Sequence, residues 1–220
     1  MDQVRILIDP AQNRYRNMAV DESLLRLVAE PVLRFYRWSE SDAVSIGYFQ
    51  PWADVPESRP FVRRYTGGGL VDHADDFTYS VILPKTHPLS LAGTAKSYEV
   101  IHHAVATALS REGFEVHLAP CADTVESPAC FQKAVRYDVV GPTGKIAGAA
   151  QRRTREGCLH QGSVRVGPHS FDSFCRSFEK TLTTALALDG TASSLTDEEK
   201  NRAAELEETR YRTELWNHSR

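Results

Sequence analysis

Apolar residues recur at helical spacing in two stretches of the sequence. The first predicted helix runs from Asn17, its candidate cap, toward Pro31, which would stop it. Its apolar positions are Val20, Leu24, Leu27 and Val28. A second helix is predicted from about Ala95 to Gly113. Its apolar face carries Tyr98, Ile101, Val105, Ala108 and Leu109.

Runs of β-branched and aromatic residues, separated by turn formers, predict strands elsewhere in the chain. These runs are 32–38, 43–49, 61–65, 77–84, 114–119, 135–140, 145–153 and 158–166. Gly-Pro-Thr-Gly at 141–144 predicts a hairpin turn between two of them. Helical periodicity returns over 171–188 and, after a short loop, over 195–216. Strands in runs, flanked by helices, predict a mainly antiparallel α+β domain.

Composition narrows the possible classes of protein. Hydrophobic residues make up 41% of the chain and charged residues 25%, which excludes a disordered protein. The net charge of −3 gives no overall basic field, so we expect no nucleic-acid partner. No apolar run approaches the roughly 18 residues of a membrane span, and the N-terminus lacks a signal-peptide pattern. The 4 cysteines contain no CxxC pair, so we expect a cytoplasmic protein without disulfides.

A glycine-rich segment offers the first candidate chemistry. Arg63 and Arg64 precede Gly67, Gly68 and Gly69 between two predicted strands. Glycines let a ligand approach the main chain, whose N–H groups can bind an anion or a carbonyl oxygen. A flexible loop is the alternative interpretation. If Arg63 and Arg64 lie on a strand, they face opposite sides, and one of them would be solvated.

Lys145 and Cys130 are the candidate reactive side chains. Lys145 opens a strand and is followed by small residues, including Gly148 and Ala149, that leave room for a ligand. By itself it is typical of a solvated lysine at a hairpin edge, whose loss would hardly affect stability. Cys130, like Cys121, Cys158 and Cys175, is by itself typical of a small buried apolar residue.

Histidines and acidic residues give weaker signals. His73 and His160 lie at the ends of predicted strands, where either could be a base, a pocket donor or a structural side chain. His102 and His103 are adjacent on a helix and cannot share one face. Asp75 and Asp76 are typical of a polar turn. We therefore predict no metal site.

Longer motifs, in consistent order from about Asn17 to Asn217, carry a resemblance to a known family. They are RNMAVDESLL, LRFYRWSESDAVSIGYFQ, FVRRYTGGGLVDHADDFTYSVIL, ACFQKAVRYDVVGPTGKIAGAAQRRTREGCLHQGSV and LTDEEKNRAAELEETRYRTELWN. Together they resemble the biotin/lipoate protein ligase and octanoyltransferase superfamily. The resemblance implies an α+β fold with a mixed, largely antiparallel sheet flanked by helices, forming a single catalytic domain over 1–220 without a C-terminal accessory domain.

The same resemblance implies a set of site residues. Lys145 matches the family's lysine, and a pocket would lie between its strand and the glycine-rich loop. The loop motif matches Arg63, Arg64, Gly67, Gly68 and Gly69, with His73 following. Gly148 and Ala149 would leave space for a medium-chain acyl group. His160 would be a further substrate-binding residue, and either His73 or His160 would be the base that deprotonates the acceptor amine.

Two branches of this superfamily differ in their use of ATP. Lipoate–protein ligases activate free lipoate with ATP and Mg²⁺, whereas cysteine-dependent octanoyl- or lipoyltransferases need no cofactor. Cys130, in an ACF motif 15 residues before Lys145, favours a transferase, as do DDFTYS and the absence of an accessory domain. Gly69, where such transferases often have arginine, and Gln132-Lys133-Ala134, in place of DAP, favour a ligase or another acyl donor.

The favoured interpretation is therefore an acyltransferase of protein lipoylation. Lys145 would lower the pKa of the Cys130 thiol, and Cys130 would carry the acyl group. The expected partners are a lipoyl carrier domain as acceptor and an acyl carrier protein or another lipoylated protein as donor, with the enzyme a monomer. A non-catalytic carrier-binding domain of the same fold is the alternative from a different class. The glycine motif of biotin ligases is absent from the sequence.

Overall fold

A computed structural model describes residues 3–121, 134–165, 167 and 171–220 of the chain. Its strands are β1 (Gln3–Ile8), β2 (Val32–Tyr36), β3 (Val44–Ile46), β4 (Phe61–Arg63), β5 (Val71–Asp72), β6 (Phe77–Pro84), β7 (His117–Leu118), β8 (Val139–Gly141), β9 (Gly144–Arg153), β10 (Gly157–Val164) and β11 (Asp189–Ala192). Its helices are α1 (Arg14–Arg26), α2 (Pro88–Leu91), α3 (Thr94–Arg111), α4 (Phe171–Leu186), α5 (Asp197–Leu206) and α6 (Glu214–Asn217). Short 3₁₀ and π-helical turns cover Trp52–Asp54 and Glu207–Tyr211.

The main sheet is mixed, with its strands in the order β11-β1-β2-β6-β10-β9-β8-β7. The pairs β11–β1 and β1–β2 are parallel, and every other pair in this sheet is antiparallel. A smaller sheet has the order β4-β3-β5. The prediction of an α+β fold with a mixed, largely antiparallel sheet is therefore confirmed.

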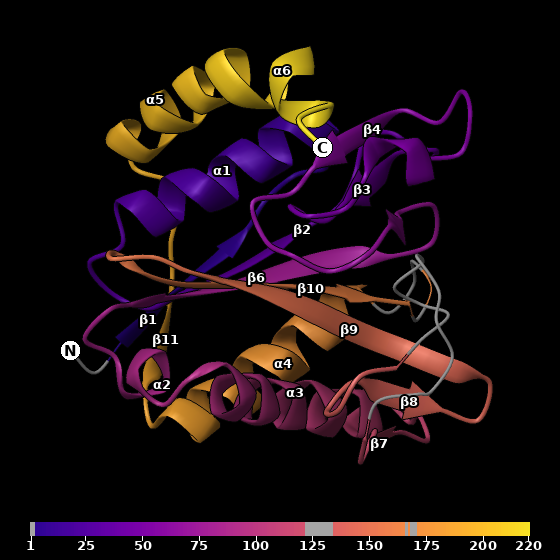
Figure 1. Cartoon of the computed structure of the whole chain (residues 1–220). Helices are drawn as coiled ribbons and strands as arrows, with labels where there is room; N and C mark the ends of the chain where they lie inside the picture. The colour runs from indigo at the N-terminus through magenta and orange to yellow at the C-terminus, as the bar shows by residue number, and fades with distance from the viewer. Residues whose placement is uncertain (1–2, 122–133, 166, 168–170) are drawn as a thin grey trace.

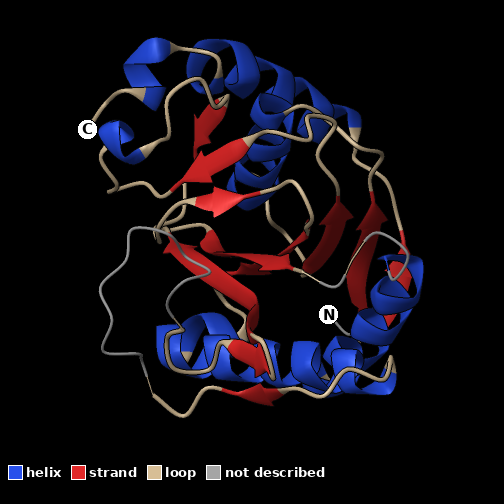
Figure 2. Cartoon of the chain, turned by 90° about the vertical axis from the view of Figure 1, so that its right-hand side faces the viewer, coloured by secondary structure: helices blue, strands red, loops and turns tan. Residues whose placement is uncertain are grey.

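Helices cover both faces of the main sheet (Figure 1). On one face, α3 and α4 bury an apolar core with Ile101, Val105, Phe174 and Phe178. On the other face, α1 and α5 bury a second core that includes Leu24. Figure 2 shows the strands as a central layer between these helices. Coverage of both faces explains why β6 and β10 are buried along their full length.

Several boundaries differ from those predicted. Helix α1 begins earlier than expected because Asn13 is its cap, accepting from the Arg16 N–H, while Asn17 is buried inside the helix. β3 and β4 are shorter than predicted because the chain turns after Ile46 and Arg63 into the loops that border the site. The helix predicted over 195–216 is broken by the π-helical turn and restarts at α6. No helix in the described ranges combines the length and the apolar character that a membrane crossing requires.

Candidate active site

Two adjoining cavities meet at Lys145. The first lies between the two sheets, and Lys145 and Gly148 of β9, Val71 of β5 and Arg64 help to line it. It is also lined by Met18, Tyr36, Trp38, Ser45, His73, Thr78, Ala149, Ala150, Gln161, Gly162 and Ser163. The second cavity is lined by Gly67, Gly68, Gly69, Thr94, Ala95, Tyr98, Val135, Arg136, Tyr137, Lys145, Ala149, Ala150 and Gln151. The structure thus brings the glycine-rich loop and the Lys145 strand together, as the resemblance implies.

Lys145 is held by a buried ion pair. Its Nζ lies 2.7 Å from Oδ2 of Asp138, and the two side chains are 7% and 0% exposed. Asp138 also accepts from the Tyr98 hydroxyl and, at 2.8 Å, from the Val135 N–H. The Tyr98 oxygen in turn accepts from the Ala149 N–H at 2.9 Å. The interpretation of Lys145 as a solvated lysine was wrong, because Asp138 draws its ammonium group into the protein.

Gly148 makes room for the lysine as well as for a ligand. A Cβ atom built on Gly148 would overlap Cε and Nζ of Lys145. The lysine side chain therefore runs over the glycine to reach Asp138. Ala149 lines both cavities, so the small residues after Lys145 do leave open space beside the strand.

The two arginines of the loop motif have different surroundings. Arg64 lines the first cavity and donates to the carbonyl oxygens of Gly67, at 3.0 Å, and Gly69, at 2.7 Å. Arg63 is fully buried and lines neither cavity; its guanidinium donates to main-chain carbonyls, including that of Asn217 at 2.9 Å. Neither arginine is solvated. Arg63 connects the loop to α6, a contact that spacing along the sequence does not reveal.

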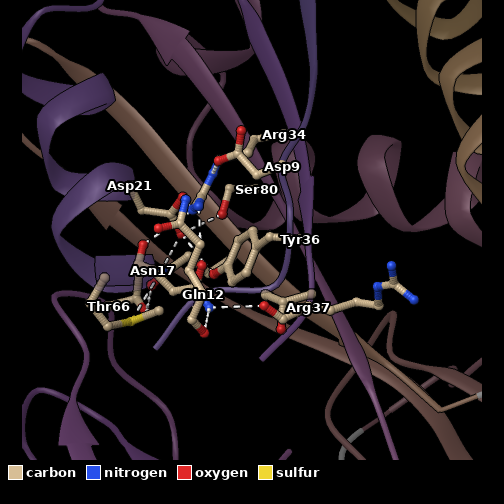
Figure 3. Close-up of polar contacts among 12 residues, drawn as sticks. Asp9, Gln12, Asn17, Asp21, Arg34, Tyr36, Arg37, Thr66 and Ser80 are labelled. Carbon is tan, nitrogen blue, oxygen red and sulfur yellow. Dashed lines mark hydrogen bonds and ion pairs between the residues drawn. The ribbon is translucent and has the colours of Figure 1, made fainter. Parts of the chain in front are cut away.

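The glycine-rich loop is fixed at its base by a buried polar network (Figure 3). Thr66 donates to Gln161 at 2.6 Å, and Gln161 donates to Asp21 at 2.6 Å. Asp21, on α1, also accepts from Arg34, Tyr36 and Ser80. These donors compensate the buried carboxylate for the water it has lost. Within the loop, Gly68 has φ of +87°, a left-handed conformation that favours glycine.

The two candidate histidines occupy different environments. His73 lines the first cavity; its Nε2 is 2.7 Å from Ser45 Oγ and its Nδ1 is 2.9 Å from Asp76. His160 lies in the middle of β10 rather than at a strand end and lines neither cavity. Its ring nitrogens contact Tyr79 and Gln151, and burial lowers its pKa well below the ordinary value. Neither histidine has a ring nitrogen without a protein partner.

Cys130 lies outside the described residues, so its place relative to Lys145 remains a prediction. Among the described cysteines, Cys158 and Cys175 are buried, and burial raises the pKa of the Cys175 thiol to about 12. Burial also raises the pKa of Cys158. The apolar interpretation is therefore confirmed for these two thiols. It was wrong for Cys121, which is exposed.

Sequence reasoning missed several residues that build the site. Asp138 sits in a segment predicted only as a strand, and Tyr98 was assigned to the apolar face of a helix. Asp76, taken as part of a polar turn, has a fully buried carboxylate that faces His73. The spacing His73-x-x-Asp76 is a signal that could have revealed this contact. No pattern in the sequence marks Asp138, whose contact with Lys145 is visible only in the folded structure.

Comparison with known proteins identifies the family. The family model of the lipoyl protein ligase A/B catalytic domain matches residues 13–209. The chain belongs to this family. Octanoyltransferase LipM of Brevibacillus brevis is 31% identical over 99% of this chain and 99% of its own. LipM of Staphylococcus aureus is 35% identical over 70% of this chain, and the match spans 62% of that relative. The predicted membership of the superfamily is confirmed, and the octanoyltransferase relatives confirm the predicted reaction class.

Solved structures agree on the fold. A Thermoplasma acidophilum protein with bound lipoic acid, Ta0514, superimposes with a TM-score of 0.82 at 23% identity, over 99% of each chain. A lipoate-protein ligase A with bound ATP gives 0.80 at 24% identity, over 98% of each chain. At these identities the likeness establishes the fold alone, while the LipM relatives indicate acyl transfer.

Proposed function

We propose that this protein transfers an octanoyl group from a thioester, through an acyl-Cys130 intermediate, to a lysine of a lipoyl carrier domain. The observation that carries this proposal is Lys145, held in a buried ion pair where two cavities meet. The octanoyltransferase relatives supply the reaction class. Acceptor and donor identity, and a monomeric state, stay predictions.

The first half-reaction forms a thioester on the enzyme. The Cys130 thiolate attacks the carbonyl carbon of the donor, and negative charge develops on the carbonyl oxygen. The Lys145 ammonium group, fixed by Asp138, can stabilise that charge without reorganising. The bond to the donor sulfur then breaks, and the departing thiolate takes up the proton that the Cys130 thiol released.

The second half-reaction forms the amide. The acceptor amine, after losing one proton to solvent, attacks the acyl-Cys130 carbonyl carbon. The carbon–sulfur bond breaks, and the Cys130 thiolate accepts the second proton from the nitrogen. Lys145 can stabilise the same oxygen in this step. No ATP is consumed, because the incoming thioester already carries the activated acyl group.

The acyl chain would lie in the first cavity. Met18, Val71 and Ala149 contribute apolar groups to its lining, and Gly148 adds no side chain. Burial at about 0.8 kcal/mol per CH₂ would give an eight-carbon chain about 5 kcal/mol of binding free energy. A polar group on the buried acyl chain would reduce this binding free energy, because removing it from water costs free energy.

Intact-protein mass spectrometry tests the proposal directly. The wild-type protein incubated with octanoyl-acyl carrier protein and no ATP should gain one octanoyl group that hydroxylamine removes. Addition of a lipoyl domain should move the group to that domain. Cys130→Ser should remain folded and unmodified, since a hydroxyl ionises far less readily than a thiol, whereas Cys121→Ser should behave like wild type.

The ligase alternative gives the opposite pattern. It predicts no acyl-cysteine, strict dependence on ATP with free lipoate, and a Cys130→Ser variant of near-normal activity. That result would refute acyl-cysteine transfer while leaving membership of the family intact.

A further inference from the structure

A chain of hydrogen bonds crosses the wall of the first cavity and ends at the glycine-rich loop. It starts at Asp76, whose carboxylate is 2.9 Å from Nδ1 of His73. Nε2 of His73 is 2.7 Å from Ser45 Oγ, which is 2.7 Å from Nη1 of Arg64. Nη2 of Arg64 reaches the carbonyl oxygens of Gly67 and Gly69. We call Asp76, His73, Ser45 and Arg64 the relay.

The chemistry of the groups limits the direction of each hydrogen bond. Arg64 can only donate, so Ser45 Oγ accepts from it, and the Asp76 carboxylate accepts from Nδ1 of His73. Nε2 of His73 accepts from the Ser45 hydroxyl when the ring is neutral and donates to it when the ring is protonated. The ring is further held by stacking on Trp38, with centroids 3.7 Å apart and an interplanar angle of 17°. In both protonation states of His73, Arg64 and Asp76 hold the two ends of the relay.

Serine, histidine and aspartate in series also occur in hydrolases, but here the serine oxygen and both histidine nitrogens already have protein partners. In a catalytic triad the serine oxygen faces the substrate and the histidine receives its proton. Ser45 is 0% exposed and already accepts from Arg64, and both nitrogens of His73 are occupied. The arrangement is suited to holding atoms in place.

We propose that Asp76, His73 and Ser45 are positioning residues for the acyl donor, acting through Arg64 on the glycine-rich loop. This inference rests on the proposed function. Arg64 lines the first cavity while Gly67 and Gly69 line the second, so Arg64 connects the relay in the wall of the first cavity to the loop that lines the second. Its loss should weaken donor binding, seen as a higher KM for the octanoyl donor, with kcat largely retained.

Two substitutions of His73 separate positioning from proton transfer. A glutamine amide has both a donor nitrogen and an acceptor oxygen, as the neutral imidazole has a donor and an acceptor nitrogen, but it cannot carry a proton as a base. His73→Gln should therefore keep kcat within about threefold of wild type, whereas His73→Leu should raise KM for octanoyl-acyl carrier protein about tenfold. A loss of kcat of about a hundredfold or more in both His73→Gln and His73→Leu would show that His73 carries a proton and would overturn the proposal.

Ser45→Ala tests whether the residues act in series. It should raise the donor KM about as much as His73→Leu, and the double variant should be little worse than either single one. Ser23→Ala is the matched control, because the Ser23 hydroxyl is equally buried but donates to Glu199 between α1 and α5. An unchanged KM for Ser45→Ala, or labelling of Ser45 by a serine-reactive phosphonate, would refute the positioning role.

Calorimetric titration with octanoate separates this inference from the proposed function. His73→Leu and Ser45→Ala should each bind octanoate about tenfold more weakly than wild type and than the control Ser23→Ala. If wild type transfers no acyl group but this order of affinities holds, the transferase proposal fails and the positioning role stands. If all variants bind octanoate equally, the positioning role fails whatever the transfer assay shows.

Discussion

Replacing Lys145 by methionine should destabilise the fold as well as abolish acyl transfer. The change leaves the fully buried Asp138 carboxylate without its cation. Removing one partner of a buried ion pair costs about 3–5 kcal/mol when the remaining charge is fully uncompensated. Here the Tyr98 hydroxyl and the Val135 N–H remain as donors, and the adjoining cavities admit water. We therefore expect a loss of about 2 kcal/mol in the free energy of unfolding.

Urea denaturation at neutral pH measures this loss, with an unchanged m-value as the sign that the two end states are comparable. In thermal unfolding the same loss would lower Tm by roughly 4–8 °C for a chain of this size. The control is Lys145→Met combined with Asp138→Asn, which removes both charges. Because a buried pair replaced as a whole is often nearly neutral, the double variant should recover much of the stability but none of the activity.

Stability is the quantity that decides this prediction. A free energy of unfolding for Lys145→Met within about 0.5 kcal/mol of wild type would be typical of a surface substitution. It would mean that Asp138 does not depend on Lys145 and that the lysine is solvated. A double variant less stable than Lys145→Met would show that the Asp138 carboxylate is held mainly by its other donors.

Two further predictions concern neighbours of this pair. Gly148→Ala should reduce acyl transfer at least tenfold and lower the unfolding free energy by no more than the loss of about 2 kcal/mol expected for Lys145→Met, because the new Cβ would displace the end of Lys145 and crowd Oδ1 of Asp138; normal activity would contradict this. Burial lowers the pKa of His102 from 6.5 to about 4, so the unfolded state binds more protons between these pH values. The unfolding free energy should therefore fall as the pH drops through this window, by up to about 1.4 kcal/mol per pH unit from this residue, and equal slopes for wild type and His102→Phe would contradict it.

The sequence predicts the centre of the fold better than its edges. β6 spans the predicted residues because its run of β-branched and aromatic residues is buried along its full length. β9 and β10 begin within one residue of the predicted starts. The polar segment at β11 has no apolar pattern and was predicted as a loop. It becomes a strand only because β1 pairs with it across the chain. Parallel pairing with a strand so distant along the chain produces no pattern in the local sequence.

The candidate site shows the same limit for single side chains. Gly68 and Lys145 could be placed in the site because their motifs resemble those of a known family. The opposed roles of Arg63 and Arg64 could not be distinguished, since both are buried and only the fold shows which carbonyl groups each one meets. Long-range partners such as Asp21 and Gln161 share no pattern in the sequence.

An irregularity in β9 explains why the orientation of Lys145 could not be read from strand alternation. Ala147 and the partly buried Ile146 both pack against the core beneath α3 and α4, although consecutive residues of a regular strand face opposite sides. The register shifts here, because Val139 pairs with Ala147 while Val140 pairs with Lys145. Such a bulge re-aims a side chain. In a regular strand Lys145 would share the core face of Ala147. The shifted register instead lets it lie over Gly148, beside the cavities, and reach Asp138.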